Sequence, residues 1–384
     1  MTTCWVRCGN WCDGRTLEGT LQESLRIDFG ARMAAAENYP FCTIEPNVAK
    51  VLVPDARLDA LGKACGTAKV VPGFVEIRDI AGLIKGASQG AGMGNKFLSH
   101  IRGVSAILHV VRCFKDSKIM HMDNNLEHLD PVAEYRSVLD ELLISDMEVG
   151  HKRIATLKRK ASNDFNAQAE LNAFERALKA IENGTPARVV LTKEDRWRLS
   201  DMPFITAKPT ILVCNVDADD ARDGNELSTK LCEHAAKNGD TSIVLSANLE
   251  SEVASLNDGT SESAAFMEEM LQGFGLKEQA LHRVLRLCLD LLGLSFYYTA
   301  GKQETRAWYI PKGSKAPEAA GVIHSDFEEG FKTADVFAYD DVIKYKGPER
   351  CRLAGKVSSG GRQYVVKEGD VLEFKFDVLK GNKK

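Results

Sequence analysis

Phe74-Val-Glu-Ile-Arg-Asp79-Ile-Ala-Gly82 is an apolar run that ends in a carboxylate, with a glycine three residues later. A carboxylate at the tip of a strand can hold Mg²⁺, and a glycine there lets a backbone N–H approach the γ-phosphate of a nucleotide. The next residues, 83–94, are rich in glycine, which suits a segment that changes conformation. The pattern is typical of nucleoside-triphosphate hydrolases.

Five apolar runs predict the buried strands of a parallel α/β sheet. They cover residues 48–53, 74–78, 106–111, 210–214 and 242–245. Four runs lead directly into polar groups, namely Asp79, Arg112, Asn215 and Ser246. Polar residues end most strands, but in open α/β sheets the ligand lies beyond the carboxyl ends of the strands. Four tips with different chemistry therefore favour a ligand site at this edge.

Between the third and fourth strands, residues 130–185 have apolar positions at helical spacing and many charged residues. Asn163-Asp-Phe-Asn166 offers a turn in the middle. We expect an antiparallel helical hairpin that projects as an arm and binds a partner. From about residue 293 the pattern changes to short strands at 295–299, 306–310, 364–367 and 371–376, with one helical stretch near 326–334. This order predicts a small α+β module.

Composition limits the remaining function classes. A chain of 384 residues is long enough for two or three domains, and a net charge of −4 argues against bulk nucleic-acid binding, so no DNA partner is expected. No apolar run approaches the roughly 18 residues of a membrane helix, and the N-terminus lacks the apolar stretch of a secretory signal. Ten scattered cysteines, several among apolar neighbours, fit a reducing cytoplasm.

Four motifs closely resemble the YchF/Obg-like ATPase family. They are Glu37-Asn-Tyr-Pro-Phe-Cys-Thr-Ile-Glu-Pro-Asn47, Asp79-Ile-Ala-Gly-Leu-Ile-Lys-Gly-Ala87, Gly94-Asn-Lys-Phe-Leu98 and His109-Val-Val-Arg-Cys-Phe114. The resemblance implies an α/β fold: a P-loop NTPase-type doubly wound sheet, an inserted helical hairpin arm and a C-terminal β-grasp (TGS) module. It implies a nucleotide-binding domain at 1–130 and 206–292, the arm at 131–205 and the TGS domain at 293–380.

The resemblance also implies roles for residues near the phosphates. Thr43 and Asp79 look like the switch residues that hold Mg²⁺, and Gly82 completes the second switch. Leu83 stands where many GTPases carry a glutamine that orients the attacking water. His121 resembles the family's mobile-loop histidine, which can orient that water instead; a solvated loop histidine is the alternative.

Base recognition is carried over to two stretches that follow strands. They are Asn215-Val216-Asp217-Ala218 and Ser246-Ala247-Asn248. The family has a carboxylate where this chain has Ala218, so Asp217 or Asp219 would have to replace it. The preference for ATP over GTP is therefore open.

The first thirty residues depart from the family. A phosphate loop needs Gly-x-x-x-x-Gly-Lys-[Ser/Thr] after a first strand. Gly14 and Gly19 have the glycine spacing, but Thr20 follows them instead of lysine. Trp5-Val-Arg-Cys-Gly-Asn-Trp11 is poor material for a buried first strand, so none is expected. One hypothesis is a slip of reading frame, because suitable codons for Gln22-Glu-Ser-Leu-Arg26 would read Gly-Lys-Ser-Thr in another frame.

The leading interpretation is a ribosome-associated, ATP-preferring ATPase that binds the large subunit and acts in translation. Its enzymatic activity is open because the phosphate-binding lysine is missing. The alternatives are a ribosome- or RNA-binding protein that no longer uses nucleotide, and a GTP-binding switch.

Overall fold

The computed structural model describes residues 2–8, 47–80, 101–115, 129–161, 165–199, 204–256 and 260–377. The chain divides into two units, the first built mainly from 77–284 and the second from 50–76 and 285–384. Residues 50–76 thus group with the C-terminal part of the chain, although the sequence analysis assigned them to the nucleotide-binding domain.

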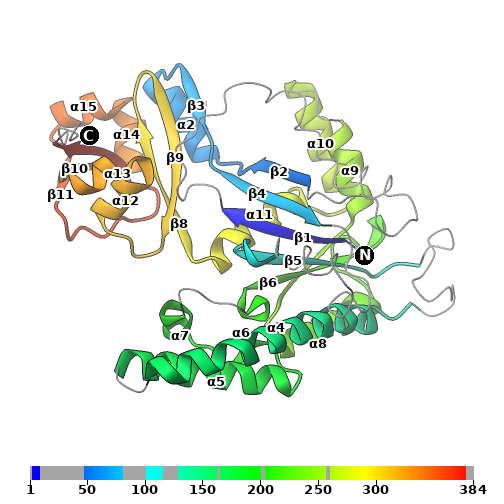
Figure 1. Ribbon diagram of the computed structural model, residues 1–384. Helices are drawn as coiled ribbons and strands as arrows, with labels where there is room; N and C mark the ends of the chain where they lie inside the picture. Colours follow the sequence, from blue (N-terminus) through cyan, green and yellow to red (C-terminus); the bar gives the residue numbers. More distant parts are fainter. Residues whose placement is uncertain are drawn as a thin grey trace. The chain divides into compact units, whose positions relative to one another are not determined.

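A six-stranded sheet in the order β2-β4-β1-β5-β6-β7 forms the centre of the first unit (Figure 1). Its strands are β1 (Thr2–Cys8), β2 (Asn47–Leu52), β4 (Phe74–Ile80), β5 (Ala106–Arg112), β6 (Thr210–Asn215) and β7 (Thr241–Leu245). All five predicted strands are present, but β2 is not buried as predicted, because Lys50 and Leu52 are exposed. Strands β5 and β6 are almost wholly buried, which explains their continuous apolar sequence, and β5, β6 and β7 are parallel.

The prediction that no first strand precedes residue 30 was wrong. Strand β1 lies between β4 and β5 and pairs with β5 in antiparallel fashion, with Thr2 opposite Val110 and Val6 opposite Ala106. Its Thr, Trp and Val residues have the strand preference that outweighed the irregular pattern. The sheet is consequently mixed rather than wholly parallel.

Helices α4 (Pro131–Ala161) and α5 (Phe165–Glu182) form the predicted hairpin and lie side by side (Figure 1). Asp130 caps α4 by accepting hydrogen bonds from the N–H groups of Val132 and Ala133 at 3.0 and 3.1 Å. A Cβ atom at Gly150 would lie 2.5 Å from Cδ1 of Leu178, so this glycine permits the close approach of the two helices. The short helices α6 (Ala187–Val190), α7 (Lys193–Arg198) and η1 (Ile205–Ala207) lead back to β6.

The rest of the first unit alternates with the last strands. Segment η2 (Ala218–Asp220) and helix α8 (Glu226–Lys237) separate β6 from β7, and α9 (Ala247–Ser255) and α10 (Ser261–Gly273) follow β7. Helix α11 (Ala280–Leu291) then leads into the second unit. The two N–H groups at its start, from Ala280 and Leu281, donate to the buried carboxylate of Glu250 at 2.8 and 3.2 Å.

The second unit has its own sheet, in the order β11-β10-β12-β8-β9-β3. The strands are β3 (Lys69–Val71), β8 (Leu294–Ala300), β9 (Glu304–Pro311), β10 (Phe331–Phe337), β11 (Ser358–Gly360) and β12 (Val371–Phe376). The helices are α2 (Ala56–Cys65), α12 (Ala316–Ile323), α13 (Ser325–Glu329), α14 (Tyr339–Tyr345) and α15 (Pro348–Leu353). This is the expected β-grasp module, extended by α2 and β3 from the N-terminal half of the chain.

Three predictions for this module were wrong. The described residues from 316 to 353 contain four helices instead of one helical stretch. The stretch 326–334 is not one helix, because α13 ends at Glu329 and residues from Phe331 onward pair with β12. Residues 364–367 form no strand, and only Val365 makes an isolated bridge, to Lys315. Tyr364 instead donates its hydroxyl to Asp370 at 2.7 Å, which holds the segment as a loop.

Candidate nucleotide-binding site

The parallel register of β5, β6 and β7 brings their carboxyl ends together. Arg112 is opposite Asn215, and Asn215 is opposite Leu245, the residue before Ser246. Three of the four predicted strand tips therefore meet at one edge of the sheet. For the fourth, Asp79, the structure describes only its place as the next-to-last residue of β4.

Asn215 is held on both sides at this edge. Its side-chain Oδ1 accepts a hydrogen bond from the N–H of Ala247 at 2.9 Å, and its carbonyl oxygen accepts one from the N–H of Cys113 at 2.7 Å. Because Oδ1 is occupied, the amide nitrogen Nδ2 is the atom that can be offered to a ligand, as a donor. The stretches 215–218 and 246–248, which are predicted to read the base and are separate in sequence, are thus joined by a direct hydrogen bond.

The second base-reading stretch opens helix α9. The hydroxyl of Ser246 caps this helix by accepting from the N–H of Leu249 at 3.4 Å, and Val216 donates its N–H to the carbonyl oxygen of Leu245 at 2.9 Å. Asn248 donates its side-chain amide to Glu252 at 2.9 Å, along the exposed face of α9. The loop is therefore fixed by its own capping and by β6.

The segment after Asn215 carries three acidic residues. Asp217 and Asp219 are exposed, whereas Ala218 is half-buried. Asp220 accepts a hydrogen bond at 2.8 Å from Nδ2 of Asn225, the residue that caps α8. Of the three carboxylates, those of Asp217 and Asp219 are the ones in an exposed position.

Several predicted site residues lie outside the described part of the chain. These are Gly14, Gly19, Thr43, Gly82 and His121. Among the described residues, no group of three or more His, Cys, Asp or Glu side chains could hold a metal ion. The expected Mg²⁺ ligands Thr43 and Asp79 and the catalytic roles of Gly82 and His121 therefore stay predictions.

Strand β1 leaves the sheet at the wrong edge for a phosphate loop. Since β1 is antiparallel to β5, its carboxyl end lies beside Ala106, at the start of β5, and Thr2 lies near the end of β5. In the parallel arrangement that a phosphate loop needs, the first strand would end at the same edge as Arg112 and Asn215. The chain therefore departs from β1 at the edge opposite the base-reading residues.

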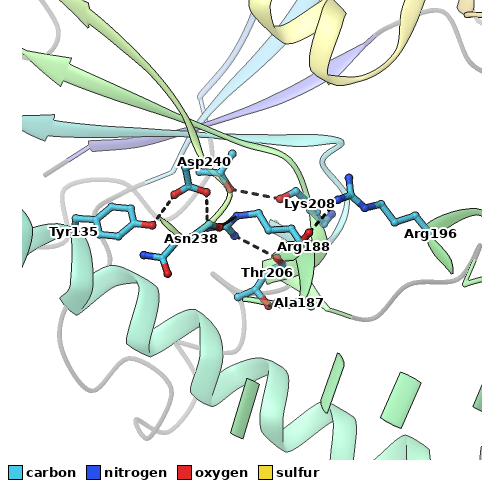
Figure 2. Close-up of polar contacts among 9 residues, drawn as sticks. Tyr135, Ala187, Arg188, Arg196, Thr206, Lys208, Asn238 and Asp240 are labelled. Carbon is cyan, nitrogen blue, oxygen red and sulfur yellow. Dashed lines mark hydrogen bonds and ion pairs between the residues drawn. The ribbon is translucent and has the colours of Figure 1, made fainter. Parts of the chain in front are cut away.

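The root of the arm is fixed to Asp240, the residue before β7, by a buried ion pair that sequence analysis did not find (Figure 2). Nη2 of Arg188, in α6, lies 2.5 Å from Oδ1 of Asp240, and both side chains are almost fully buried. Arg188 also donates to the carbonyl oxygens of Asn238 and Thr206, at 3.1 and 3.2 Å. Tyr135 of α4 donates its hydroxyl to Asp240 at 2.6 Å, so the start of α4 and helix α6, which follows the hairpin, meet at this carboxylate.

Burial controls the protonation of the groups around this pair. It raises the pKa of Asp240, against the effect of Arg188 and Tyr135, and it raises the pKa of Tyr135. His109, in β5, stacks on the ring of Tyr135 with centroids 5.5 Å apart. Burial, and then the charge of Arg188, lowers the pKa of His109 to about 3, so the imidazole is neutral in the folded protein.

A second buried carboxylate supports the same region. Asp146 of α4 accepts three hydrogen bonds of 2.7 Å, from the N–H groups of Ile205 and Thr206 and from the hydroxyl of Thr206. Burial raises the pKa of Asp146 to about 6 despite these donors. Asp146 thus connects the middle of α4 to η1, just before β6.

The far half of the arm carries exposed positive charge. Lys152, Lys158, Arg159 and Lys160 are exposed on α4. Lys158 lies 3.3 Å from Glu175 of α5, so part of the charge is compensated within the hairpin. Lys152, Arg159 and Lys160 present their charge at the surface of α4.

Two families match the chain, and several proteins are similar to it along most of its length. The family described as "50S ribosome-binding GTPase" matches residues 24–140, and YchF-GTPase_C, described as "Protein of unknown function (DUF933)", matches 294–377. The "Ribosome-binding ATPase YchF" of Bacillus subtilis is 44% identical over 349 residues, covering 90% of this chain and 93% of the relative. The protein of that name from Escherichia coli O157:H7 is 41% identical, covering 89% and 92%.

A solved structure shares the fold. The Schizosaccharomyces pombe YchF GTPase has a TM-score of 0.72 and 36% identity, covering 88% of this chain and 90% of the other. Within the residues described by the structure, none of the helices has the length and apolar character needed to cross a membrane.

The doubly wound sheet, its inserted arm and the joined strand tips define a protein of the P-loop GTPase class. The similarity to YchF proteins extends through the arm and the C-terminal module. The chain belongs to the YchF family.

Proposed function

We propose that this chain is a ribosome-associated factor of translation, working in the cytoplasm, that binds an adenine nucleotide. Its relatives are named as ribosome-binding ATPases along about nine-tenths of its length. The arm and the C-terminal module are the surfaces we assign to the large ribosomal subunit, and the basic stretch from Lys152 to Lys160 supplies charge for phosphate contacts.

The observation that carries the nucleotide half of this proposal is the bond between Asn215 and Ala247. It joins the two base-reading stretches at the carboxyl edge of the sheet and occupies the amide oxygen of Asn215, which leaves the amide nitrogen as the donor for a ligand. A nucleobase edge is a suitable acceptor for that nitrogen. Asp79, the next-to-last residue of β4, is the residue we assign to the metal that accompanies the phosphates.

Magnesium and hydrolysis belong to the same proposal. Thr43 and Asp79 would hold Mg²⁺ through their oxygen atoms, which hard divalent cations prefer. The metal would neutralise the charge of the phosphates. Gly82 would bring a backbone N–H to the terminal phosphate, and His121 would orient the attacking water.

A second function is favoured by the direction of β1. The chain leaves β1 at Cys8, at the edge opposite Asn215, and Gly14 is six residues further on. Six extended residues span at most about 20 Å, roughly the length of a strand such as β5. Only a fully extended segment would therefore bring Gly14 back to the edge that carries Asn215. Together with Thr20 in place of lysine, this favours a ribosome-binding protein whose use of nucleotide is weak or lost.

The choice of base depends on residue 218. Because Ala218 offers no carboxylate, a preference for ATP over GTP depends on Asp217 or Asp219, which are exposed on either side of it. Ala218→Glu should favour ATP by about tenfold or more, since a hydrogen bond to a charged group contributes about 1.5–3 kcal/mol. Ala218→Gln is the matched control of nearly the same size. Equal strengthening of ATP and GTP by glutamate would count against base recognition at this position.

Sedimentation with purified ribosomal subunits tests the proposed function. We expect the chain to pellet with the large subunit, and not with the small subunit, at low salt. If ATP with Mg²⁺ alters this binding and Asn215→Ala removes the effect, nucleotide and ribosome binding are coupled. Binding that is insensitive to ATP would favour the nucleotide-independent function, and no binding at low salt would refute the ribosomal role.

A further inference from the structure

Three cysteines gather beneath the base-reading edge of the sheet. Cys113 follows β5, Cys214 lies in β6 and Cys232 lies in α8, and all three are reduced. The sulfur atoms of Cys214 and Cys232 are 3.5 Å apart, and the thiol of Cys113 lies within hydrogen-bonding reach of Cys214. Cys113 and Cys214 are fully buried, whereas Cys232 is partly exposed.

The surroundings of Cys232 favour its thiolate. Its sulfur contacts that of Cys214 at 3.5 Å, and hydrogen bonding with Cys214, and then with the hydroxyl of Ser242, lowers the pKa of Cys232 to about 6 although burial acts in the opposite direction. Contact with two other thiols raises the pKa of Cys214, which keeps its proton. The pair therefore combines a partly exposed thiolate with a buried thiol in direct contact, the arrangement of an attacking and a resolving cysteine.

We propose that Cys214 and Cys232 are a site of reversible oxidation by peroxides, and that the disulfide between them displaces α8 and the segment that follows Asn215. The effect on nucleotide rests on the proposed function, but the disulfide and the displacement do not.

The reaction balances with a peroxide as the oxidant. The Cys232 thiolate attacks one oxygen of hydrogen peroxide, the O–O bond breaks, and the leaving hydroxide takes up a proton to form water. The Cys214 sulfur then attacks the sulfenic acid sulfur of Cys232, the S–O bond breaks and the S–S bond forms. The departing hydroxide takes the proton of Cys214 as a second water. Two sulfur atoms lose two electrons and the peroxide gains them; a dithiol such as dithiothreitol reverses the change.

Formation of the bond requires movement of α8. The sulfur atoms must approach from 3.5 Å to about 2.05 Å, a contraction of roughly 1.5 Å. Strand β6, which holds Cys214, is hydrogen-bonded to β5 on one side and β7 on the other, so it resists displacement. Helix α8 has no such ladder and therefore takes up most of the contraction.

The start of α8 transmits this movement to the base-reading edge. Asn225, the N-cap of α8, donates its amide to the carbonyl oxygen of Cys113 and to Asp220, both at 2.8 Å. Asp220 ends η2, the segment that follows Asn215 and Asp217. A shift of α8 toward β6 therefore strains the capping contacts of Asn225 and repositions the carboxylates of Asp217 and Asp219, which lie next to the proposed base-binding residues.

Peptide mapping of the peroxide-treated full chain tests the pairing. Free thiols are blocked with iodoacetamide, and trypsin then yields peptides 199–222 and 231–237, each with a single cysteine. We expect a linked peptide that joins Cys214 to Cys232 and disappears on treatment with dithiothreitol. Cys214→Ala should abolish it, and Cys351→Ala, at a buried thiol of the second unit, should leave it unchanged. Complete oxidation of Cys232 without this link, or a link to another cysteine, would overturn the proposal.

Hydrogen exchange of the oxidised chain tests the displacement without any nucleotide. The N–H of Ser228, which donates to the side chain of Asn225, should exchange about five- to tenfold faster after oxidation, as for the loss of one capping hydrogen bond. Cys232→Ser treated with peroxide should show no such change. Unaltered exchange in a chain with the disulfide would refute the movement of α8. ATP titrations of the reduced and oxidised chains then report separately on nucleotide: no binding by either would count against the proposed function alone.

Discussion

Replacement of Arg188 by leucine should destabilise the first unit strongly, because it leaves the carboxylate of Asp240 buried without its cation. The side chain of Asp240 is fully buried and that of Arg188 is 4% exposed, so solvent cannot replace the lost partner. Removal of one member of a buried ion pair costs about 3–5 kcal/mol. The loss of hydrogen bonds to Asn238 and Thr206 contributes to this figure.

The cost should depend on pH and on the charge of residue 240. Burial already raises the pKa of Asp240. Without Arg188 that pKa rises further, so the folded variant binds a proton that the unfolded chain releases above about pH 4. The loss in free energy of unfolding caused by Arg188→Leu should therefore be smaller at pH 5 than at pH 7. Adding Asp240→Asn removes the charge and should recover about 1–3 kcal/mol, because Tyr135 can still donate to the amide oxygen.

Urea unfolding, with hydrogen exchange of β6 and β7 amides to isolate the first unit, measures both effects. Glu226→Gln is the control: it breaks the exposed pair with Lys230 on α8, and we expect no measurable change. If Arg188→Leu is as stable as this control, or if Asp240→Asn fails to recover stability, the buried pair does not hold the arm to the sheet.

Three further outcomes can be measured. If the chain hydrolyses ATP, His121→Ala should lower kcat by about 10²-fold or more with little change in binding, as expected for a group that acts on the attacking water, and an unchanged kcat would exclude the role. Replacing Lys152, Arg159 and Lys160 by glutamate should weaken binding to the large ribosomal subunit and make that binding less dependent on salt. The control Lys237→Glu, on α8, should have neither effect. Equal effects of the two changes would show that the arm is not part of the interface. Because the pKa of His109 is lowered to about 3, only the unfolded chain takes up this proton between pH 6 and 4, so acid should lower the free energy of unfolding. In urea unfolding, His109→Phe should reduce this loss of stability by about 1.4 kcal/mol per pH unit. Parallel pH profiles of the two proteins would show that His109 does not titrate as described.

The sequence predicted those features that local patterns determine. The continuous apolar runs at β5 and β6 identify strands buried on both faces, and the helical spacing of residues 130–185 identifies the arm. The placement of Asn215 and Ser246 at strand ends was enough to expect them at one edge, and the parallel register brings them there. Confirmation of the family then agrees with motifs read from residues 37–114.

The features that were missed depend on contacts between distant residues. The spacing of Arg188 and Asp240 in the sequence does not predict an ion pair, because the two residues belong to different parts of the fold. The direction of β1 depends on which neighbour it pairs with, and strand preference carries no direction. The approach of Cys113 to Cys214 could have been anticipated once β5 and β6 were aligned at their tips, since their final residues are paired. Cys232 had no such signal, because the packing of α8 against β6 decides its position.

In the C-terminal module, the short elements defeated a prediction from local pattern. Helices of five to eight residues, such as α12, α13, α14 and α15, give too few turns for a clear periodicity. Val365 and Val366 have the residue types of a strand, but the bond from Tyr364 to Asp370 and the isolated bridge to Lys315 organise this segment as a loop. Tertiary contacts outweighed strand preference there.

The central claim is that the base-reading edge is formed in this chain whereas the phosphate-binding segment is altered. The most direct test is calorimetric titration of ATP with Mg²⁺ into this chain and into a chimera. In the chimera, residues 1–30 are replaced by a strand parallel to β5 and the sequence Gly-x-x-x-x-Gly-Lys-Ser. The missing lysine alone corresponds to about 1.5–3 kcal/mol, so the unmodified chain should bind roughly 10–150-fold more weakly than the chimera, with little hydrolysis. Asn215→Ala should weaken binding in the chimera. Micromolar ATP binding with steady turnover by the unmodified chain would contradict this account.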